Sequence, residues 1–397
     1  MMSVWSSLVG QDDAVAKLSE AAASARAIVA SRAGSAARED ARSMSHAWLI
    51  TGPPGSGRSV AARAFAAALQ CTGEEVGCGT CPGCRTTMGR TNADVLFAAT
   101  ETSIINVETA RSLVLQAQSS PSQGLWRVIV VEDADRLGEA GANALLKAIE
   151  EPPEHTVWLL CAPSPEDMIA TIRSRCRHLG LRIPTANAVA DLLVRECVAT
   201  PEVALEAARA AQSHIGLARA LAADPEMRAR RRAIVTAPAS VRSVGEAVLA
   251  ADRLLETAKA QADAQVSERN AREKAELLRQ LGMEEDERAT KASRTLIRQL
   301  EEDQKRRSKR ALTDAIDRAL IDLLAIYRDV LMTQVGGDGE LINADLADLV
   351  RSIAAESTPR QTLSRVDHIE TARRRLKSNG NTLLVLEDMA ISLRPQA

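Results

Sequence analysis

Short apolar runs alternate with helical patterns along the first 180 residues of the chain. The apolar runs have the length of strands and lie at residues 48–51, 94–99, 126–131 and 156–161. Between them, apolar residues recur at the spacing of amphipathic helices. Strands buried on both faces of a parallel sheet read as nearly continuous apolar runs, and their connections are helical. The pattern therefore predicts an α/β domain over residues 1–180, with a mainly parallel sheet flanked by helices.

Only helical patterns follow the last of these strands. Residues 181–238 are predicted to form a small helical domain, and residues 239–397 a larger all-helical domain. Within the larger domain, residues 256–310 are rich in Ala, Glu, Lys and Arg, which predicts a charged helical insertion. Residues 31–45 lack apolar periodicity and are predicted to form a mobile loop.

Composition narrows the class of protein. The chain has 397 residues, of which 46% are hydrophobic and 26% charged, as expected for a soluble protein of two or three domains. A net charge of −2 argues against a large phosphate-binding surface, and 2% aromatic residues leave little for base stacking. The absence of a membrane-span pattern and of a signal-peptide pattern predicts a cytoplasmic protein without a membrane partner.

A glycine-rich stretch directly follows the first predicted strand. It contains Gly52, Gly55 and Gly57, and it ends in Arg58 and Ser59 at the start of an Ala-rich helical pattern. A strand, a glycine loop and a helix form a phosphate-binding unit, because backbone N–H groups converge on phosphate oxygens at the helix N-terminus. In such loops a lysine and a Ser or Thr serve the outer phosphates and Mg²⁺. Here the spacing is kept, but arginine stands at the lysine position.

Four closely spaced cysteines come after this helix. They are Cys71, Cys78, Cys81 and Cys84, in a stretch rich in glycine. Four thiolates in a reducing compartment suit tetrahedral Zn²⁺, and a site filled by four protein ligands is structural rather than catalytic. The alternatives are a loop of unliganded thiols or an adventitious redox pair. We expect zinc, because packing gives no reason to cluster four cysteines in such a loop.

An acidic pair, Glu132 and Asp133, follows the third predicted strand. In phosphate-loop ATPases such a pair holds Mg²⁺ and orients the attacking water. Acidic residues at a strand end are common and usually solvated, so this pair gains weight only from the glycine loop upstream.

Five stretches, in this order along the chain, resemble the clamp-loader branch of AAA+ proteins. They are residues 8–11, 46–59, 71–84, 143–153 and 174–176. The nearest type is the delta-prime subunit of bacterial DNA polymerase III, followed by its gamma/tau ATPase type. Each motif alone is weak, whereas the combination is specific.

The resemblance implies an AAA+ module, a helical lid over residues 181–238 and a helical collar over residues 239–397. It also implies a five-subunit assembly that binds ATP or ADP with Mg²⁺, opens a sliding clamp and places it on primed DNA. The expected partners are gamma/tau-type ATPase and delta-type subunits. Arg175 would be an arginine finger acting in trans on a neighbour's γ-phosphate, and Arg219 a second sensor in the lid.

Three departures from the active pattern argue against hydrolysis. Arg58 replaces a compact lysine, Glu132 and Asp133 reverse the usual Asp-Glu order, and Ala162 with Pro163 stands where active relatives carry a polar sensor. The leading hypothesis is therefore a non-hydrolysing clamp-loader subunit that scaffolds the complex and is not an ATPase by itself. The alternatives are an ATP-hydrolysing motor subunit and a zinc-containing nucleic-acid-binding module that uses the basic run at residues 305–310. We interpret that run as a solvated helix face.

Overall fold

The computed structural model describes residues 3–31, 43–98, 105–281, 291–378 and 380–394. Its packing divides the chain into two units, Met1–Arg219 and Ala220–Ala397. The predicted boundaries at residues 180 and 238 stay predictions, and most of the loop predicted at residues 31–45 lies outside the described residues. None of the helices in the described ranges is both long and apolar enough to cross a bilayer.

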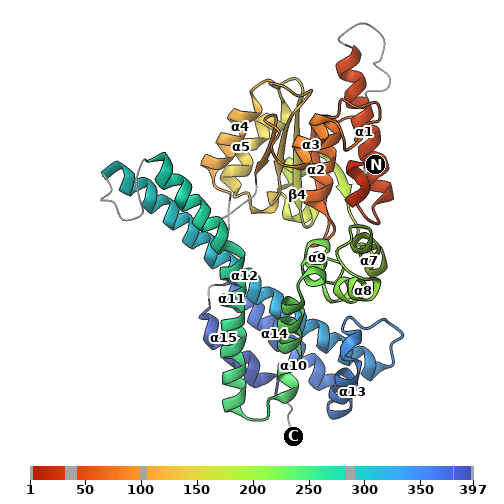
Figure 1. Cartoon of the computed structure of the whole chain (residues 1–397), viewed down its shortest axis with the longest axis vertical. Coiled ribbons are helices and arrows are strands. Elements are labelled where there is room, and N and C mark those ends of the chain that lie inside the picture. Colours follow the sequence, from red (N-terminus) through yellow and green to blue (C-terminus); the bar gives the residue numbers. More distant parts are fainter. Residues whose placement is uncertain (1–2, 32–42, 99–104, 282–290, 379, 395–397) are drawn as a thin grey trace. The chain divides into compact units, whose positions relative to one another are not determined.

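A five-stranded parallel sheet forms the centre of the first unit (Figure 1). Its strands are β1 (Ala47–Thr51), β2 (Val95–Ala98), β3 (Arg127–Val131), β4 (Thr156–Ala162) and β5 (Arg177–Gly180), in the spatial order β2-β3-β4-β1-β5. The predicted parallel sheet is thus confirmed. Strand β5 was not expected, because it is a short edge strand with Leu179 as its one buried apolar residue.

Helices cover both faces of this sheet. One face packs against α1 (Asp12–Ser31) and α2 (Arg58–Leu69), and the other against α4 (Val107–Ala117) and α5 (Glu139–Glu150). Successive strand residues point to opposite faces. Accordingly, Trp48 and Ile50 of β1 belong to the first core, whereas Leu49 belongs to the second. Burial on both sides explains the continuous apolar runs in the sequence.

A buried carboxylate fixes the connection into β3. Asp94, with no exposed surface, accepts hydrogen bonds from the backbone N–H groups of Ser122, Gln123 and Gly124 at 2.6–2.8 Å. Burial opposes ionisation of this carboxyl, but the N–H donors outweigh it and hold the pKa of Asp94 below its usual value. The Asp94 carboxylate is therefore a buried negative charge whose hydrogen-bond donors are all supplied by the protein.

Shorter helices complete the first unit. They are α3 (Pro82–Met88), α6 (Ala170–Arg173), α7 (Ala186–Arg195), α8 (Pro201–Ala210) and the beginning of α9 (Ile215–Ala223), with the 3₁₀ turns η1 (Val4–Ser7), η3 (Ala134–Arg136) and η4 (Pro165–Asp167). Helix α7 packs on α8. Two of these short elements carry predicted site residues, since α3 contains Cys84 and α9 contains Arg219.

The second unit is helical throughout the part that the structure describes. It contains α10 (Pro225–Ser240), α11 (Val244–Gln280), α12 (Lys291–Val335), the turn η5 (Ala344–Leu346), α13 (Ala347–Glu356), α14 (Pro359–Lys377) and α15 (Thr382–Ser392). Capping boxes begin α11 at Ser243 and α14 at Thr358. Helices α11, α12, α14 and α15 enclose one apolar core. The predicted helical C-terminal region is confirmed.

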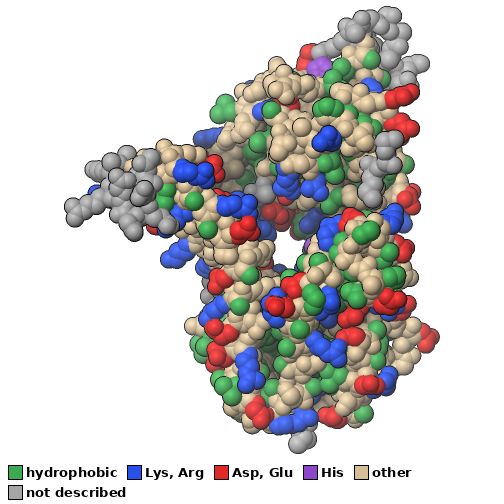
Figure 2. All heavy atoms as spheres, viewed as in Figure 1, with side chains coloured by type: hydrophobic (Ala, Val, Ile, Leu, Met, Phe, Trp, Pro, Cys, Tyr) green, Lys and Arg blue, Asp and Glu red, His purple; other side chains and the backbone are tan. Residues whose placement is uncertain are grey.

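The charged insertion is part of a long helical hairpin formed by α11 and α12. Ala262, Val266 and Ala311 make a small apolar core between the two helices. Farther out, Arg307 donates to Asn270 and Glu273, at 2.9 Å to each. Side chains of both charge signs lie on the hairpin surface (Figure 2). Three arginines of the basic run, Arg306, Arg307 and Arg310, form ion pairs with acidic residues outside the run.

Candidate functional site

The glycine loop joins β1 to α2, as the sequence predicts. At Gly55 the backbone has a φ of +92°, and an added Cβ would lie 2.8 Å from the Cα atom of His214. At Gly52 an added Cβ would lie 2.8 Å from the carbonyl oxygen of Leu181. Only glycine fits a backbone this closely packed. Gln11, from the motif near the N-terminus, donates to the Ser56 carbonyl oxygen and links α1 to the loop.

Arg58 turns back onto the loop that precedes it. Its guanidinium donates to the carbonyl oxygen of Gly52, and Ser59 lies half-buried in the first turn of α2. The Gly52 N–H in turn donates to the carbonyl oxygen of Pro163 at 3.2 Å. Ala162, at the predicted sensor position, is buried and apolar. The Arg58 guanidinium therefore already has a hydrogen-bond acceptor within the protein.

The acidic pair lies where β3 ends, close to the loop. Glu132 forms an ion pair with Arg90, with 2.5 Å between the Nη2 and Oε1 atoms. Arg90 follows α3 in a left-handed conformation with a φ of 58°, and its guanidinium lies 5.0 Å from the centre of the Phe97 ring. Glu132 and Asp133 are near enough to act on the buried Cys161 thiol, whose pKa is raised to about 12 by burial first and by Glu132 second.

Sequence analysis missed two arginines of this region, Arg63 and Arg90. Arg63 lies one helical turn after Ser59 on α2, and its Nε atom is buried without a hydrogen-bond partner among the described residues. Burial, and then the positive charge of Arg90, lower the pKa of Arg63. The spacing from Ser59 could have indicated Arg63. Nothing in the sequence pattern indicates Arg90, since its position depends on how the cysteine-rich segment folds.

The two arginines predicted from the family pattern have different neighbours. Arg219, on α9, binds Glu196 through two nitrogen atoms, with distances of 2.6–3.0 Å. Arg175 follows α6, and its side chain is 41% exposed. It pairs with Glu150 at 2.5 Å and donates to the Thr171 carbonyl oxygen at 2.9 Å. The structure thus brings Arg58, Glu132 and Asp133 together, whereas Arg175 contacts another part of the unit.

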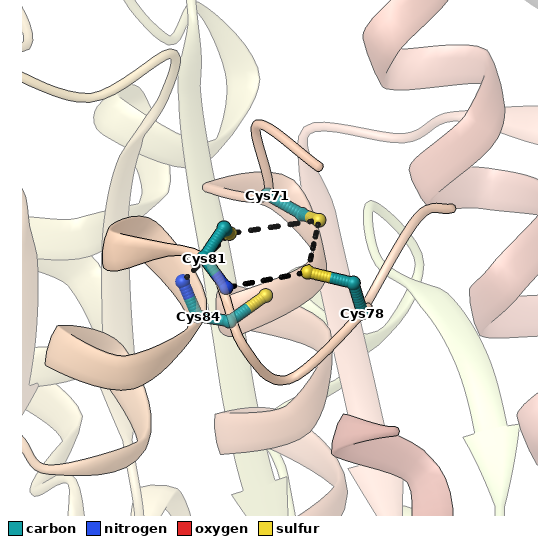
Figure 3. Close-up of side chains that lie close together, drawn as sticks. All are labelled: Cys71, Cys78, Cys81 and Cys84. Atoms are coloured by element: carbon teal, nitrogen blue, oxygen red, sulfur yellow. Dashed lines mark hydrogen bonds between the residues drawn. The ribbon is translucent and has the colours of Figure 1, made fainter. Parts of the chain in front are cut away.

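The four cysteines converge on one point, between the end of α2 and the start of α3 (Figure 3). All four sulfur atoms lie within 4.8 Å of one another. The Sγ atom of Cys71 is 3.7 Å from that of Cys78 and 3.9 Å from that of Cys81. A zinc tetrahedron with Zn–S bonds of about 2.3 Å has edges of about 3.8 Å between sulfur atoms. The geometry therefore fits Zn²⁺, and it is too open for disulfides.

Local hydrogen bonds prepare two of the thiols for metal binding. A hydrogen bond with Thr80 and the backbone N–H of Cys81 lower the pKa of Cys78. Burial opposes ionisation of Cys81, but N–H donors such as that of Cys84 lower its pKa to about 6. Burial raises the pKa of the Cys84 thiol. Zinc held by these four cysteines would have a structural role, since all four tetrahedral positions are protein sulfur atoms.

Two regions of the chain match known protein families. Residues 35–185 match the family described as DNA polymerase III, delta subunit, and residues 287–394 match the family described as DNA polymerase III, delta subunit, C terminal. Among solved structures, a DNA polymerase III gamma subunit-related protein from Thermotoga maritima aligns with 88% of this chain and 93% of its own, at 17% identity and a TM-score of 0.41.

Curated relatives match the first part of the chain. The DNA polymerase III subunit delta' of Escherichia coli is 34% identical over 180 residues, which are 44% of this chain and 54% of that protein. The DNA polymerase III subunit gamma/tau of Mycobacterium tuberculosis is 35% identical over 164 residues, 40% of this chain and 28% of that protein. The chain thus spans about half or less of the length of these relatives. With family matches in both its units, the chain belongs to the DNA polymerase III clamp-loader family, in which its relatives are delta' and gamma/tau subunits.

Proposed function

We propose that the chain is a non-hydrolysing subunit of the replicative clamp loader, which scaffolds the complex and donates Arg175 in trans to a neighbouring ATPase subunit. Its partners are gamma/tau-type and delta-type subunits, and through the complex a sliding clamp and primed DNA. Zn²⁺ at the four cysteines is structural. ATP or ADP with Mg²⁺ has no catalytic role at the chain's own loop, and the protein acts in the cytoplasm.

The exposure of Arg175 carries this proposal. Its side chain is 41% exposed, and that of its partner Glu150 is 42% exposed. An ion pair between exposed side chains contributes about 0–1 kcal/mol, so exchanging the carboxylate for a neighbour's phosphate costs little. A planar guanidinium at a subunit surface suits the charge that develops in phosphoryl transfer.

The loop of this chain supports the non-hydrolysing part of the proposal. Arg58 donates to Gly52, Glu132 is paired with Arg90, and no polar side chain stands at Ala162. A motor subunit of the gamma/tau type is the second candidate, because relatives of that type match as well as the delta' relatives do. It would require these contacts to rearrange.

Steady-state ATP hydrolysis by the reconstituted complex tests the trans role. We expect Arg175→Ala to leave the melting temperature of the chain unchanged and to reduce the DNA-stimulated ATPase of its partners by about a thousandfold, the typical contribution of an arginine finger. Arg173→Ala, which removes an exposed arginine from the short helix that precedes Arg175, is the matched control. Normal hydrolysis by the complex with Arg175→Ala would show that the finger role is wrong.

A further inference from the structure

We infer that the glycine loop takes a polyphosphate anion without a divalent cation, because Glu132, the carboxylate expected to face the cation, is already paired with Arg90. The anion is recognised through its phosphate oxygens, whether it belongs to a nucleotide or to inorganic polyphosphate. This binding does not depend on the trans role of Arg175.

The residues at the end of β3 do not fit a resident Mg²⁺. Magnesium needs oxygen ligands in near-ideal octahedral geometry at about 2.0–2.1 Å. The Glu132 carboxylate that would face it already binds the Arg90 guanidinium at 2.5 Å, and its side chain is only 14% exposed. The positive charge of Arg90, whose side chain is 43% exposed, is thus paired with the mostly buried Glu132 carboxylate.

Two groups next to the loop lack partners. The Ser56 hydroxyl is buried, with 1% of the residue exposed, and has no hydrogen-bond partner among the described residues. It lies inside the turn of the loop, 2.5 Å from where a Cβ on Gly52 would be. The buried Nε atom of Arg63 is likewise unpartnered. Buried polar groups normally find partners, and an anion at the N-terminus of α2 would supply them.

Charge favours the same ligand. Burial and then the positive charge of Arg90 lower the pKa of Arg63; Glu132 opposes this, and Arg219 adds to it. Repulsion among these guanidinium groups is relieved by a multivalent anion. A phosphate chain would thus bind to fixed arginines where related loops use Mg²⁺ as the bridge.

Isothermal titration of the full chain with tripolyphosphate and with ATP tests this inference. Divalent cations are removed from the buffers by chelating resin, since a free chelator would compete for the four-cysteine site. We expect tripolyphosphate to bind in this metal-free buffer, and added Mg²⁺, which complexes the free anion in solution, not to tighten that binding. Absence of binding, or binding that requires Mg²⁺, would overturn the inference. Tighter binding of ATP would identify a nucleotide, and equal affinities the phosphate chain alone; both uphold it.

Three variants separate the anion site from a general effect on folding. Arg90→Gln should weaken binding in the absence of Mg²⁺ by about tenfold, and added Mg²⁺ should restore it through the freed Glu132. Glu132→Gln should instead tighten binding, because it leaves Arg90 unpaired. Arg85→Gln, an exposed arginine on α3, is the control and should change nothing. Equal affinities for all three variants would contradict the role of Arg90, provided that circular dichroism shows them folded.

Discussion

The four-cysteine cluster and the glycine loop lie at opposite ends of α2, and they differ in how far their polar groups are already satisfied. At the cluster, four thiols converge with 3.7 and 3.9 Å between sulfur atoms, and their hydrogen bonds are the weak ones that sulfur makes. At the loop, Arg58, Glu132 and Arg219 each have a protein partner. We therefore expect the first site to depend on a metal for its stability. At the second site these charged side chains already have protein partners, although the Ser56 hydroxyl and the Arg63 Nε atom have none among the described residues.

This difference is consistent with the proposal that the first unit keeps the architecture of a nucleotide site without hydrolysing ATP. Glycines at close approaches preserve the loop because the backbone would not fit otherwise. The side chains that would contact phosphates are free to change, and here Arg58 donates to the Gly52 carbonyl oxygen while Glu132 pairs with Arg90. The geometry of the loop backbone is therefore a poor guide to whether the chain hydrolyses ATP. The hydrogen-bond and ion-pair partners of Arg58 and Glu132 are a better guide.

Among the variants that test this comparison, removal of a predicted zinc ligand should lower the stability of the chain the most. Cys84 is fully buried, so Cys84→Ser should lower the free energy of unfolding by more than about 4 kcal/mol, as loss of a structural metal does. The melting temperature should fall by about 10 °C. Thermal melts and zinc content by atomic emission check this. Cys197→Ser, at an exposed cysteine, should change neither, and full stability of a zinc-free wild-type chain would contradict a structural metal.

At Asp94 a cluster of backbone N–H groups already binds an anion, the carboxylate of the protein itself. Asp94→Asn should destabilise the first unit by about 2–3 kcal/mol at neutral pH, because the amide presents N–H groups to backbone N–H donors. The pKa of Asp94 is held below its usual value in the folded state, so this stabilisation is present above that value and is lost as the pH falls through the folded-state pKa. Urea unfolding at several pH values measures it. A difference between the two proteins that does not shrink in acid would be inconsistent with an ionised Asp94.

Strain at the glycine loop can be measured without any ligand. Gly55→Ala should lower the free energy of unfolding by about 1–3 kcal/mol, since a Cβ at a φ of +92° meets the backbone of His214. Gly245→Ala is the matched control, because nothing lies within 4 Å of its added Cβ and it sits in a helix. That variant should be neutral or stabilising by up to about 1 kcal/mol. Equal urea midpoints for the two variants would show that the loop is not closely packed.

Restoring the loop lysine should have the smallest effect. In Arg58→Lys, Glu132 remains paired with Arg90 and Ala162 remains apolar, so we expect no gain in ATP hydrolysis by the chain alone. Release of inorganic phosphate at saturating ATP measures this, with a gamma/tau-type subunit as the positive control. Turnover appearing in R58K would mean that a single residue separates this chain from an active enzyme, and it would favour the motor hypothesis.

The sequence pattern was most informative where burial is strongest. Residues 126–131 and 156–161 predicted β3 and β4 to within a residue or two, because both faces of these strands are buried and their runs are nearly continuous in apolar residues. The edge strand β5 carries no such signal, since three of its residues are partly or fully exposed. The helical content of the charged insertion followed from composition. Its pairing into a hairpin depends on Arg307 with Asn270 and Glu273, which are far apart in sequence.

The candidate site divides in the same way. Spacing alone predicted that the four cysteines would meet, because three of them lie within one short turn and helix. Spacing could not indicate that Arg90 would pair with Glu132, which is 42 positions away, or that Arg219 would bind Glu196. Such ion pairs depend on long side chains from separate elements, and no local pattern encodes them. The zinc, nucleotide and arginine-finger assignments stay predictions.

The hairpin of α11 and α12 allows the length of the charged insertion to vary. Val266 and Ala311 pack in the same small core, so the chain leaves and re-enters the helical bundle at neighbouring points. Residues added or removed in equal numbers from both helices beyond this point would lengthen or shorten the hairpin without displacing the bundle. Evolution could therefore adjust the reach of this segment while the core that holds α12, α14 and α15 stayed intact. The bundle can therefore accept helical hairpins of different lengths at this position.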